Sequence, residues 1–374
     1  MKIAVVGLRG IPNIMGGIES HCQQIYPRIA DEGVEVTVIG RSPYLEKRKT
    51  EYKGVSIVGL WAIQNKFLET FLHTFIAIIY SAVFIRPDVL HVHAIGPAIF
   101  TPFARLLGLK VVVTHHGADY DRQKWNALAK YILKTGEKMA CRFANKVIVV
   151  GRSLTSELQN RFPKRKRNII FIPNGTLANF GFDCVNSDLP KDLSVSSDGY
   201  ILAVARLVPE KGLHDLINAF NHSETPYKLV IVGDADHDDE YSQQIKKEAS
   251  EEVVIAGRRS GIELQSLYKF ARVFVLPSYH EGHPIVALEA ISAGTKVILS
   301  DIQPNLDIAL QTDCYFKVGD VDSLTRKLNN LDKLNLHVEQ SEFLARYDWN
   351  AIAIETKNQY ANVLGLVQGD KGTV

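Results

Sequence analysis

Residues 278–294 read SYHEGHPIVALEAISAG, and they follow the apolar run VFVL at 273–276. A short apolar run, then a polar loop, then apolar residues at helical spacing predicts a strand, a loop and a helix. Pro284 suits the first helical turn, where no backbone N–H is needed, and Gly294 suits the helix end. This unit is typical of an α/β domain with alternating strands and helices.

Two carboxylates lie in this stretch. Glu281 falls in the predicted loop, and Glu289 falls just over one turn inside the predicted helix. A helix N-terminus offers N–H groups and a partial positive charge to a phosphate, and carboxylates accept hydrogen bonds from paired hydroxyls. The pattern therefore fits a ligand that carries both a phosphate and sugar hydroxyls. Alternatively, Glu281 caps the helix and Glu289 is a solvated or paired acid.

Length and composition indicate a soluble protein of two domains. The chain has 374 residues, with 46% hydrophobic and 22% charged residues, enough for two full cores. The four cysteines have no metal-ligand spacing, which favours a reducing compartment. The N-terminus runs directly into an apolar strand, so we expect no signal peptide.

The charge is unevenly distributed along the chain. Residues 1–174 contain 25 Lys and Arg against 12 Asp and Glu, and the remainder contains 18 against 29. Lys130, Lys134 and Lys138 follow one side of a predicted helix, and residues 164–167 form a cluster of four basic side chains. This pattern predicts an anionic partner such as a membrane, an acidic glycan or nucleic acid. Mutual attraction of the two halves, or simple solvation, is the alternative.

The first half reads as a doubly wound βαβ series, with strands at 2–6 and 33–39 around the loop GLRGIPNIMGG at 7–17. The glycine spacing is not G-x-G-x-x-G, and the second strand ends without an acid, which argues against a dinucleotide dehydrogenase. Gly16 and Gly17 either let the backbone approach a ligand closely or form an ordinary tight turn.

The strand 110–114 ends in His115, His116 and Gly117. Ligands bind at this edge of a parallel sheet, so His116 is a candidate site residue. The apolar run 67–85 is nearly long enough to span a membrane. We expect a buried crossover helix there, with a helix lying in a membrane surface as the alternative.

The second half repeats the series after residues 177–199, which are polar and aperiodic and are predicted to be a linker. The strand 200–205 leads into RLVPEKG at 206–212, where Arg206 and Lys211 could clamp a diphosphate. Surface ion pairing, for instance with Glu210, is the alternative.

The predicted domains are 1–176, joined by a C-terminal helix at about 352–374, and 200–351. A last amphipathic helix after a complete domain can pack back on the first domain.

In combination, these motifs resemble the retaining glycosyltransferases of family 4, which have the GT-B fold of two Rossmann-like domains facing a cleft. The most specific parts are RLVPEKG and the pair Glu281 and Glu289, which match the E-x7-E motif of the family. The opening, residues 7–19, is similar to a branch found in bacterial surface-polysaccharide clusters. The resemblance covers almost the whole chain.

The resemblance implies a role for each matching residue. Arg206 and Lys211 would neutralise the departing diphosphate, so no metal and no cofactor are expected. Glu289 would accept hydrogen bonds from the ribose, and Glu281 would hold the donor sugar near the reacting carbon. His116 would contact the donor sugar from the other domain.

Further substrate contacts are implied around these residues. Gly16 and Gly17 would approach the phosphate and the acceptor, with Glu19 and His21 as weaker candidates on the acceptor side. Gly257 and Arg258 would lie by the base. The backbone at the helix start would meet the phosphate or the sugar, at Gly282, His283, Pro284 and Ile285.

Two departures qualify the resemblance. Many members carry Phe-Gly-Leu-Pro after the first glutamate, whereas this chain has HPIV at 283–286, which leaves the donor sugar open. The triplet DAD at 234–236 matches the metal-binding Asp-x-Asp pattern only nominally and reads as a polar loop after a strand.

We therefore expect a cytoplasmic bacterial enzyme, peripheral on the inner membrane face. It would move a sugar from a nucleotide-sugar, with UDP as the expected carrier, to a glycan or polyprenyl-linked acceptor in cell-surface polysaccharide synthesis. A nucleotide-sugar epimerase of GT-B-like fold is one alternative, and a non-catalytic module that binds glycan or membrane is another. No nucleic-acid partner is expected.

Overall fold

The computed structural model describes residues 1–63, 68–122, 125–178, 180–235 and 239–366. The chain divides into two units, one of residues 1–174 with 349–374 and one of residues 175–348. Of the predicted C-terminal helix, residues 367–374 lie outside the described residues. Each unit is built on its own sheet, which confirms two Rossmann-like α/β domains.

The sheet of the first unit has the order β3-β4-β2-β1-β5-β6-β7-β8, parallel except for the edge strand β3. Its central strands are buried on both faces, as continuous apolar runs require in a parallel sheet. The strands are β1 Lys2–Val6, β2 Glu35–Arg41, β3 Lys49–Tyr52, β4 Val55–Leu60, β5 Val89–His93, β6 Val111–His115, β7 Lys146–Val149 and β8 Ile169–Phe171.

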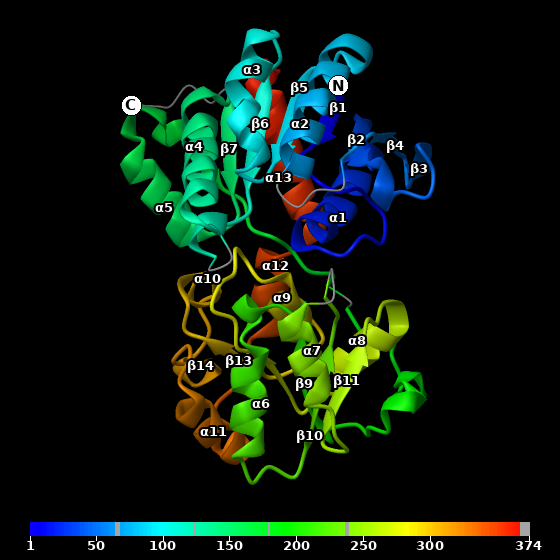
Figure 1. Cartoon of the computed structure of the whole chain (residues 1–374), viewed down its shortest axis with the longest axis vertical. Helices are drawn as coiled ribbons and strands as arrows, with labels where there is room; N and C mark the ends of the chain where they lie inside the picture. Colours follow the sequence, from blue (N-terminus) through cyan, green and yellow to red (C-terminus); the bar gives the residue numbers. More distant parts are fainter. Residues whose placement is uncertain (64–67, 123–124, 179, 236–238, 367–374) are drawn as a thin grey trace. The chain divides into compact units, whose positions relative to one another are not determined.

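Helices cover both faces of this sheet. Because crossovers between parallel strands are right-handed, α1 lies on one face and α2 to α5 lie on the other. Figure 1 shows the red C-terminal helix α13 returning to lie against the blue α1. The helices are α1 Gly17–Asp31, α2 Leu68–Tyr80 with a π-helical continuation Ser81–Ile85, α3 Thr101–Leu106, α4 Ala127–Phe143, α5 Arg152–Arg161 and α13 Trp349–Leu364.

The sheet of the second unit is entirely parallel, with the order β11-β10-β9-β12-β13-β14. The strands are β9 Tyr200–Val204, β10 Lys228–Val232, β11 Val253–Gly257, β12 Val273–Leu276, β13 Val297–Ser300 and β14 Tyr315–Phe316. The helices are α6 Leu213–Asn221, α7 Glu240–Lys247, α8 Gly261–Lys269, α9 Ile285–Ser292, α10 Gln303–Leu306, α11 Val321–Asn329 and α12 Gln340–Arg346.

Residues 177–199, predicted to be a linker, instead belong to the second unit. Phe180, Leu189 and Leu193 are buried in its core, and Lys269 Nζ donates to the carbonyl of Cys184 at 2.9 Å. The apolar anchors are irregularly spaced around two short 3-10 turns, so no periodicity reveals them. The unit also ends at Asp348, slightly before the predicted boundary.

The helix predicted to be buried, at 67–85, is a crossover between β4 and β5 but is buried on one side only. Phe67 lies outside the described residues, and the segment Leu68–Ile85 has a mean hydropathy of 1.8 with only 28% of it buried. By length and composition alone, it is a helix that could cross a membrane. Apolar character on every side therefore did not indicate burial on every side.

Candidate functional site

The second unit has a topological switch point between β9 and β12. The chain leaves β9 toward β10 on one side and leaves β12 toward β13 on the other, so the loops after these two strands part at the carboxyl edge. Such a crevice is where open α/β sheets bind ligands. Residues 206–212 follow β9 and residues 277–284 follow β12, so both predicted motifs meet there.

Gly212 allows the two loops to touch. It has a φ of +63°, and a Cβ at this position would lie 2.2 Å from the carbonyl oxygen of Pro277. Beside it, the amide of Tyr279 donates to the carbonyl oxygen of Glu210 at 2.9 Å. Only glycine fits both the backbone conformation and the close approach.

Lys211 and Glu281 form an ion pair within this contact. Their Nζ and Oε1 atoms are 2.6 Å apart, and the Ser278 hydroxyl donates to the same oxygen at 2.7 Å. Burial alone would raise the pKa of Glu281, but Lys211 and Ser278 more than offset it and hold the pKa below its usual value. The acid is therefore ionised and holds the lysine at the sheet edge. Arg206 is half-buried on the same loop.

Glu289 lies one turn inside α9. The hydroxyl of Tyr268 donates to its Oε2 at 3.2 Å, and burial raises the pKa of Glu289 to about 7. Pro284 is the N-cap of this helix rather than a residue of its first turn, and Gly294, with a φ of +81°, follows its end as predicted. His283, beside the cap, is buried, and burial lowers its pKa to about 4.

The remaining predicted positions of this unit lie farther along the same edge. Gly257 and Arg258 are at the end of β11, which β10 and β9 separate from β12. Gly257 has a φ of +64°, and no atom lies within 4 Å of a Cβ placed there, so its outer side is open. The structure thus puts these residues on the ligand edge but not beside the Lys211–Glu281 pair.

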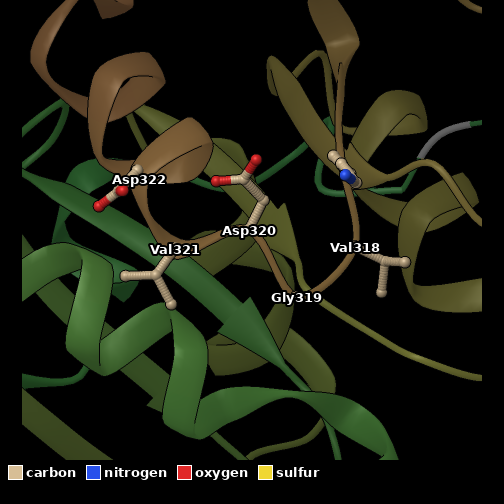
Figure 2. Close-up of a pocket in the computed structure, with 6 residues that line it drawn as sticks. Val318, Gly319, Asp320, Val321 and Asp322 are labelled. Carbon is tan, nitrogen blue, oxygen red and sulfur yellow. The ribbon is translucent and has the colours of Figure 1, made fainter.

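A separate hollow is lined by residues 317–322 (Figure 2). Asp320 accepts a hydrogen bond from the amide of Ser323 and caps α11. A Cβ at Gly319 would lie 3.2 Å from the hydroxyl oxygen of Tyr279, so the hollow adjoins the loop after β12. None of the predicted site residues lines it, and we assign it no chemistry.

The first unit has its own switch point, between β1 and β5. The predicted glycine-rich loop follows β1, and Gly7, with a φ of +99°, is so close to β5 that a Cβ would lie 2.3 Å from the carbonyl oxygen of His93. Glu19 is buried beneath this loop, where its Oε1 accepts from the amide of Arg9 at 3.0 Å. In this structure Glu19 therefore braces the loop that carries Gly16 and Gly17.

His116 follows β6 and is held by a second histidine. Its Nε2 is 2.8 Å from Nδ1 of His93, and Nε2 of His93 is hydrogen-bonded to the Tyr26 hydroxyl. The Tyr26 hydroxyl is also 2.9 Å from Nδ1 of His91, which contacts the Tyr360 hydroxyl of α13 at 2.7 Å. A chain of buried imidazoles and phenols thus extends from His116 into the core.

Sequence reasoning missed His91 and His93, although the HVH ending of β5 places both on one face of a strand. His21, predicted as a weaker candidate on the acceptor side, lies beside the rings of His93 and His116, and its Nδ1 is 2.9 Å from Oδ1 of Asn174. Burial lowers the pKa of His21 to about 4 and that of His91 to about 3, and it holds those of His93 and His116 well below the ordinary value. These imidazoles are neutral at neutral pH.

Three of these rings also form a potential ligand set. Among the described residues, ring nitrogens of His21, His93 and His116 all lie within 4.8 Å of one another. Three imidazoles are a common ligand set for zinc. Here, however, the nitrogens of His93 and His116 that face each other are already joined by the 2.8 Å hydrogen bond.

Two family models match the chain. Residues 15–176 match the model "Glycosyltransferase Family 4", and residues 187–347 match "Glycosyl transferases group 1". The two matches fall on the two units and together span most of the chain.

Individual proteins agree with this assignment. An uncharacterised glycosyltransferase of Methanocaldococcus jannaschii is 26% identical over 96% of this chain and 98% of its own. An Escherichia coli UDP-Gal:alpha-D-GlcNAc-diphosphoundecaprenol alpha-1,3-galactosyltransferase is 28% identical over 66% of this chain and 64% of its own. The structure of sucrose-phosphate synthase from Thermosynechococcus elongatus superposes with a TM-score of 0.82 and 20% identity, covering 98% of this chain and 100% of the other. The chain belongs to the family 4 glycosyltransferases of GT-B fold.

Proposed function

We propose that this glycosyltransferase moves a sugar from a UDP-sugar to a hydroxyl of a polyprenyl-diphosphate-linked glycan, with retention of the anomeric configuration. The observation that carries the proposal is the Lys211–Glu281 ion pair at the switch point, with Arg206 on the same loop. It combines a cation for a diphosphate with an acceptor for sugar hydroxyls at the ligand edge of one sheet.

The reaction requires, above all, that the negative charge developing on the departing diphosphate is stabilised. Lys211 supplies a point charge and Arg206 a planar fork of donors, and the N-terminus of α9 adds backbone N–H groups. Preorganised donors of this kind stabilise a developing anion strongly because they need not reorganise. We therefore assign the neutralisation to side chains and backbone, with no metal in that role.

Glu281 has a positioning role in this scheme. Its carboxylate already holds Lys211, so the lysine is oriented before the donor arrives. Its other oxygen accepts hydrogen bonds from the sugar hydroxyls. We do not assign it as a nucleophile, because its low pKa reflects a charge that Lys211 already satisfies. The departing diphosphate takes the acceptor proton on the face that it leaves, which gives retention.

Glu289 and the first unit complete the assignment. Glu289 accepts hydrogen bonds from the ribose hydroxyls, just as one of its oxygens accepts one from the hydroxyl of Tyr268. His116 is neutral and its Nε2 is bonded to His93, so its Nδ1 either donates to or accepts from a sugar hydroxyl, and a neutral ring suits a sugar better than a phosphate. The backbone at Gly16 and Gly17 approaches the acceptor, and no atom lies within 4 Å of a Cβ placed at Gly17.

The acceptor and location follow from the relatives and the charge. The Escherichia coli relative is named for a diphosphoundecaprenol-linked acceptor, which supports a lipid-linked glycan in surface-polysaccharide assembly. The excess of Lys and Arg over Asp and Glu in residues 1–174 favours contact with an anionic inner leaflet. The enzyme would then act at the cytoplasmic face of the membrane.

The test is a transfer assay with UDP-, GDP- and dTDP-sugars and an undecaprenyl-diphosphate-linked glycan, read by mass spectrometry and by the anomeric coupling constant of the product. Arg206→Ala and Lys211→Met should each lower the rate at least a hundredfold, whereas Lys247→Ala, an exposed lysine of α7, should not. Full activity of the first two variants would refute the clamp. An isomerised donor formed without acceptor would instead favour the epimerase.

A further inference from the structure

The outer side of α2 and its continuation is a stripe of large apolar side chains. From Leu68 to Val83 they recur every three or four residues, so they share one helix face, and Phe84 follows directly after Val83. Phe84 is 72% exposed and Leu68 is 55% exposed. The full stripe is Leu68, Leu72, Phe75, Ile79, Val83 and Phe84.

The inner side of the same helix is firmly anchored to the sheet. Ala77 and Ile78 are buried in the core, and Nε2 of His73 contacts the carbonyl oxygen of Gly40 at 3.0 Å. Glu69 pairs with the buried Arg41 at 3.3 Å. Turning this helix to span a bilayer would break these buried contacts, so the stripe faces outward while the helix stays on the sheet.

The apolar stripe continues onto neighbouring helices. The ring of Phe75 stacks on Phe103 of α3 at 5.1 Å between centroids, and α3 packs on α4, as Figure 1 shows. Exposed apolar residues follow at the end of α3 and the start of α4. We call the stripe together with Leu106, Leu107, Leu128 and Tyr131 the apolar face.

The described helices that carry the apolar face expose cations and no acid. The acids of α2 with its continuation, α3 and α4 are Glu69 and Glu137, and both point inward. Glu137 is fully buried and pairs with Arg161 at 2.8 Å. The exposed charged residues of these helices and their C-caps are the cations Arg86, Lys134, Lys138 and Arg142, and the exposed acid Asp88 lies in the loop two residues after Arg86.

An apolar face whose helices expose cations and no acid complements an anionic lipid surface. Helices that lie in a membrane interface have this composition, with the apolar side buried about 5–10 Å into the boundary between headgroups and acyl chains. Large exposed apolar patches that are rimmed by polar residues mark binding surfaces for proteins or membranes. The cations match anionic headgroups at about 1 kcal/mol each near the surface.

We propose that the apolar face is a membrane-insertion surface, with α2 lying parallel to an anionic bilayer and Phe84, Leu68 and Tyr131 among the inserted side chains. This goes beyond electrostatic docking of a basic domain, because insertion of apolar side chains persists when salt screens the charges. It rests on the geometry of the first unit and not on the proposed transfer reaction.

The experiment is flotation of the full chain with vesicles of phosphatidylcholine and phosphatidylglycerol at 0.1 M and 1 M salt. The wild type should stay bound at 1 M salt. Phe84→Ser should lower partitioning about tenfold, and Leu68→Ser with Phe84→Ser about a hundredfold. Phe182→Ser is the matched control, because Phe182 is 75% exposed in the second unit.

Two outcomes would overturn the proposal. One is complete release of the wild type at 1 M salt, which would show that only charge contacts, which salt screens, hold the protein to the vesicle. The other is unchanged vesicle binding in the double variant, together with conversion of a dimer to a monomer in light scattering without lipid. That result would assign the face to a second copy of the chain. The circular dichroism spectrum and the thermal unfolding of every variant, measured in parallel, show whether the first unit keeps its fold, whatever the transfer assay gives.

Discussion

Glu289→Gln is expected to remove the pH dependence of donor binding between pH 6 and pH 8. With a pKa of about 7, the wild-type carboxyl is ionised in roughly 90% of molecules at pH 8 and in roughly 10% at pH 6. If the ribose hydroxyls donate to the carboxylate, affinity should fall about tenfold over this range. The glutamine variant cannot titrate, so its affinity should be flat.

The size of the effect at fixed pH follows from the hydrogen bonds. Bonds to an ionised acceptor are roughly twice as strong as neutral ones, so the variant should bind about five- to tenfold more weakly than wild type at pH 8. The two proteins should converge at pH 6. Calorimetry with UDP-glucose is the assay, because its diphosphate diester keeps a constant charge, whereas the terminal phosphate of UDP titrates near pH 6.

Stability gives a second, independent readout of the same group. The folded-state pKa of Glu289 is raised, so its contribution to stability is greatest below pH 4.5 and is lost as the pH rises through about 7. The shift corresponds to roughly 3 kcal/mol, which partial access to water reduces to about 2 kcal/mol. Urea unfolding at pH 8 should therefore show Glu289→Gln to be more stable than wild type.

Either of two results would refute this reasoning. A flat affinity for UDP-glucose in the wild type would mean that the ribose does not rely on the carboxylate. A glutamine variant with the wild-type pH dependence would assign the titration to another group. Glu240→Gln is the control, because this acid of α7 is exposed in the same unit. It should change neither affinity nor stability.

Four further predictions concern other contacts. Lys211→Met should destabilise the second unit by about 3 kcal/mol in urea, because Glu281 keeps a buried charge without its cation; an unchanged midpoint would argue against the pair. Gly212→Ala should cost at least about 2 kcal/mol and lower the transfer rate, since its Cβ would meet Pro277; a fully active, stable variant would contradict this close approach. The pKa of His21 is lowered to about 4, so its contribution to stability is present above pH 6.5 and is lost as the pH falls toward 4; His21→Gln should make that acid limb less steep in urea, where His91, His93 and His116 also contribute, and an equal slope would exclude His21. Chelation by EDTA should leave the transfer rate unchanged, and a loss restored by Zn²⁺ would instead place an ion on the three histidines.

The sequence predicted best the strand, loop and helix around Glu281, because residues close together in the chain specify these three elements. The apolar run before residue 278 and the glycine and proline around the next helix define a strand, a loop and a helix, and the structure has all three. What sequence could not supply is the pairing of Lys211 with Glu281, which lie 70 residues apart. That pairing depends on β9 lying next to β12, and strand order is a property of the whole sheet.

The histidine chain shows the same limit. The HVH ending of β5 contained a usable signal, because residues two apart on a strand share a face. The partner Tyr360 comes from α13, which packs back on the first unit from the far end of the chain. No local pattern specifies that contact. Likewise, the composition of α2 gave its helix but not its exposed side, because only the neighbours of a helix decide which side they cover.

The two units place opposite pH requirements on one enzyme, and together these set its working range. In the first unit, the buried imidazole of His21 favours a folded state above pH 6.5, where it is neutral. In the second unit, burial favours the protonated carboxyl of Glu289, so the fold is more stable below about pH 7. The proposed hydrogen bonds from the ribose need the ionised carboxylate, which predominates above about pH 7. The second unit therefore gives up stability in the pH range where the proposed donor contact forms. Donor binding favours the ionised form of Glu289, and a ligand that binds only the folded state stabilises it by mass action, which offsets this loss. A stabilisation by UDP-glucose that grows from pH 6 to pH 8 is the consequence, and the Lys211–Glu281 pair, whose acid is ionised throughout, contributes nothing to that growth.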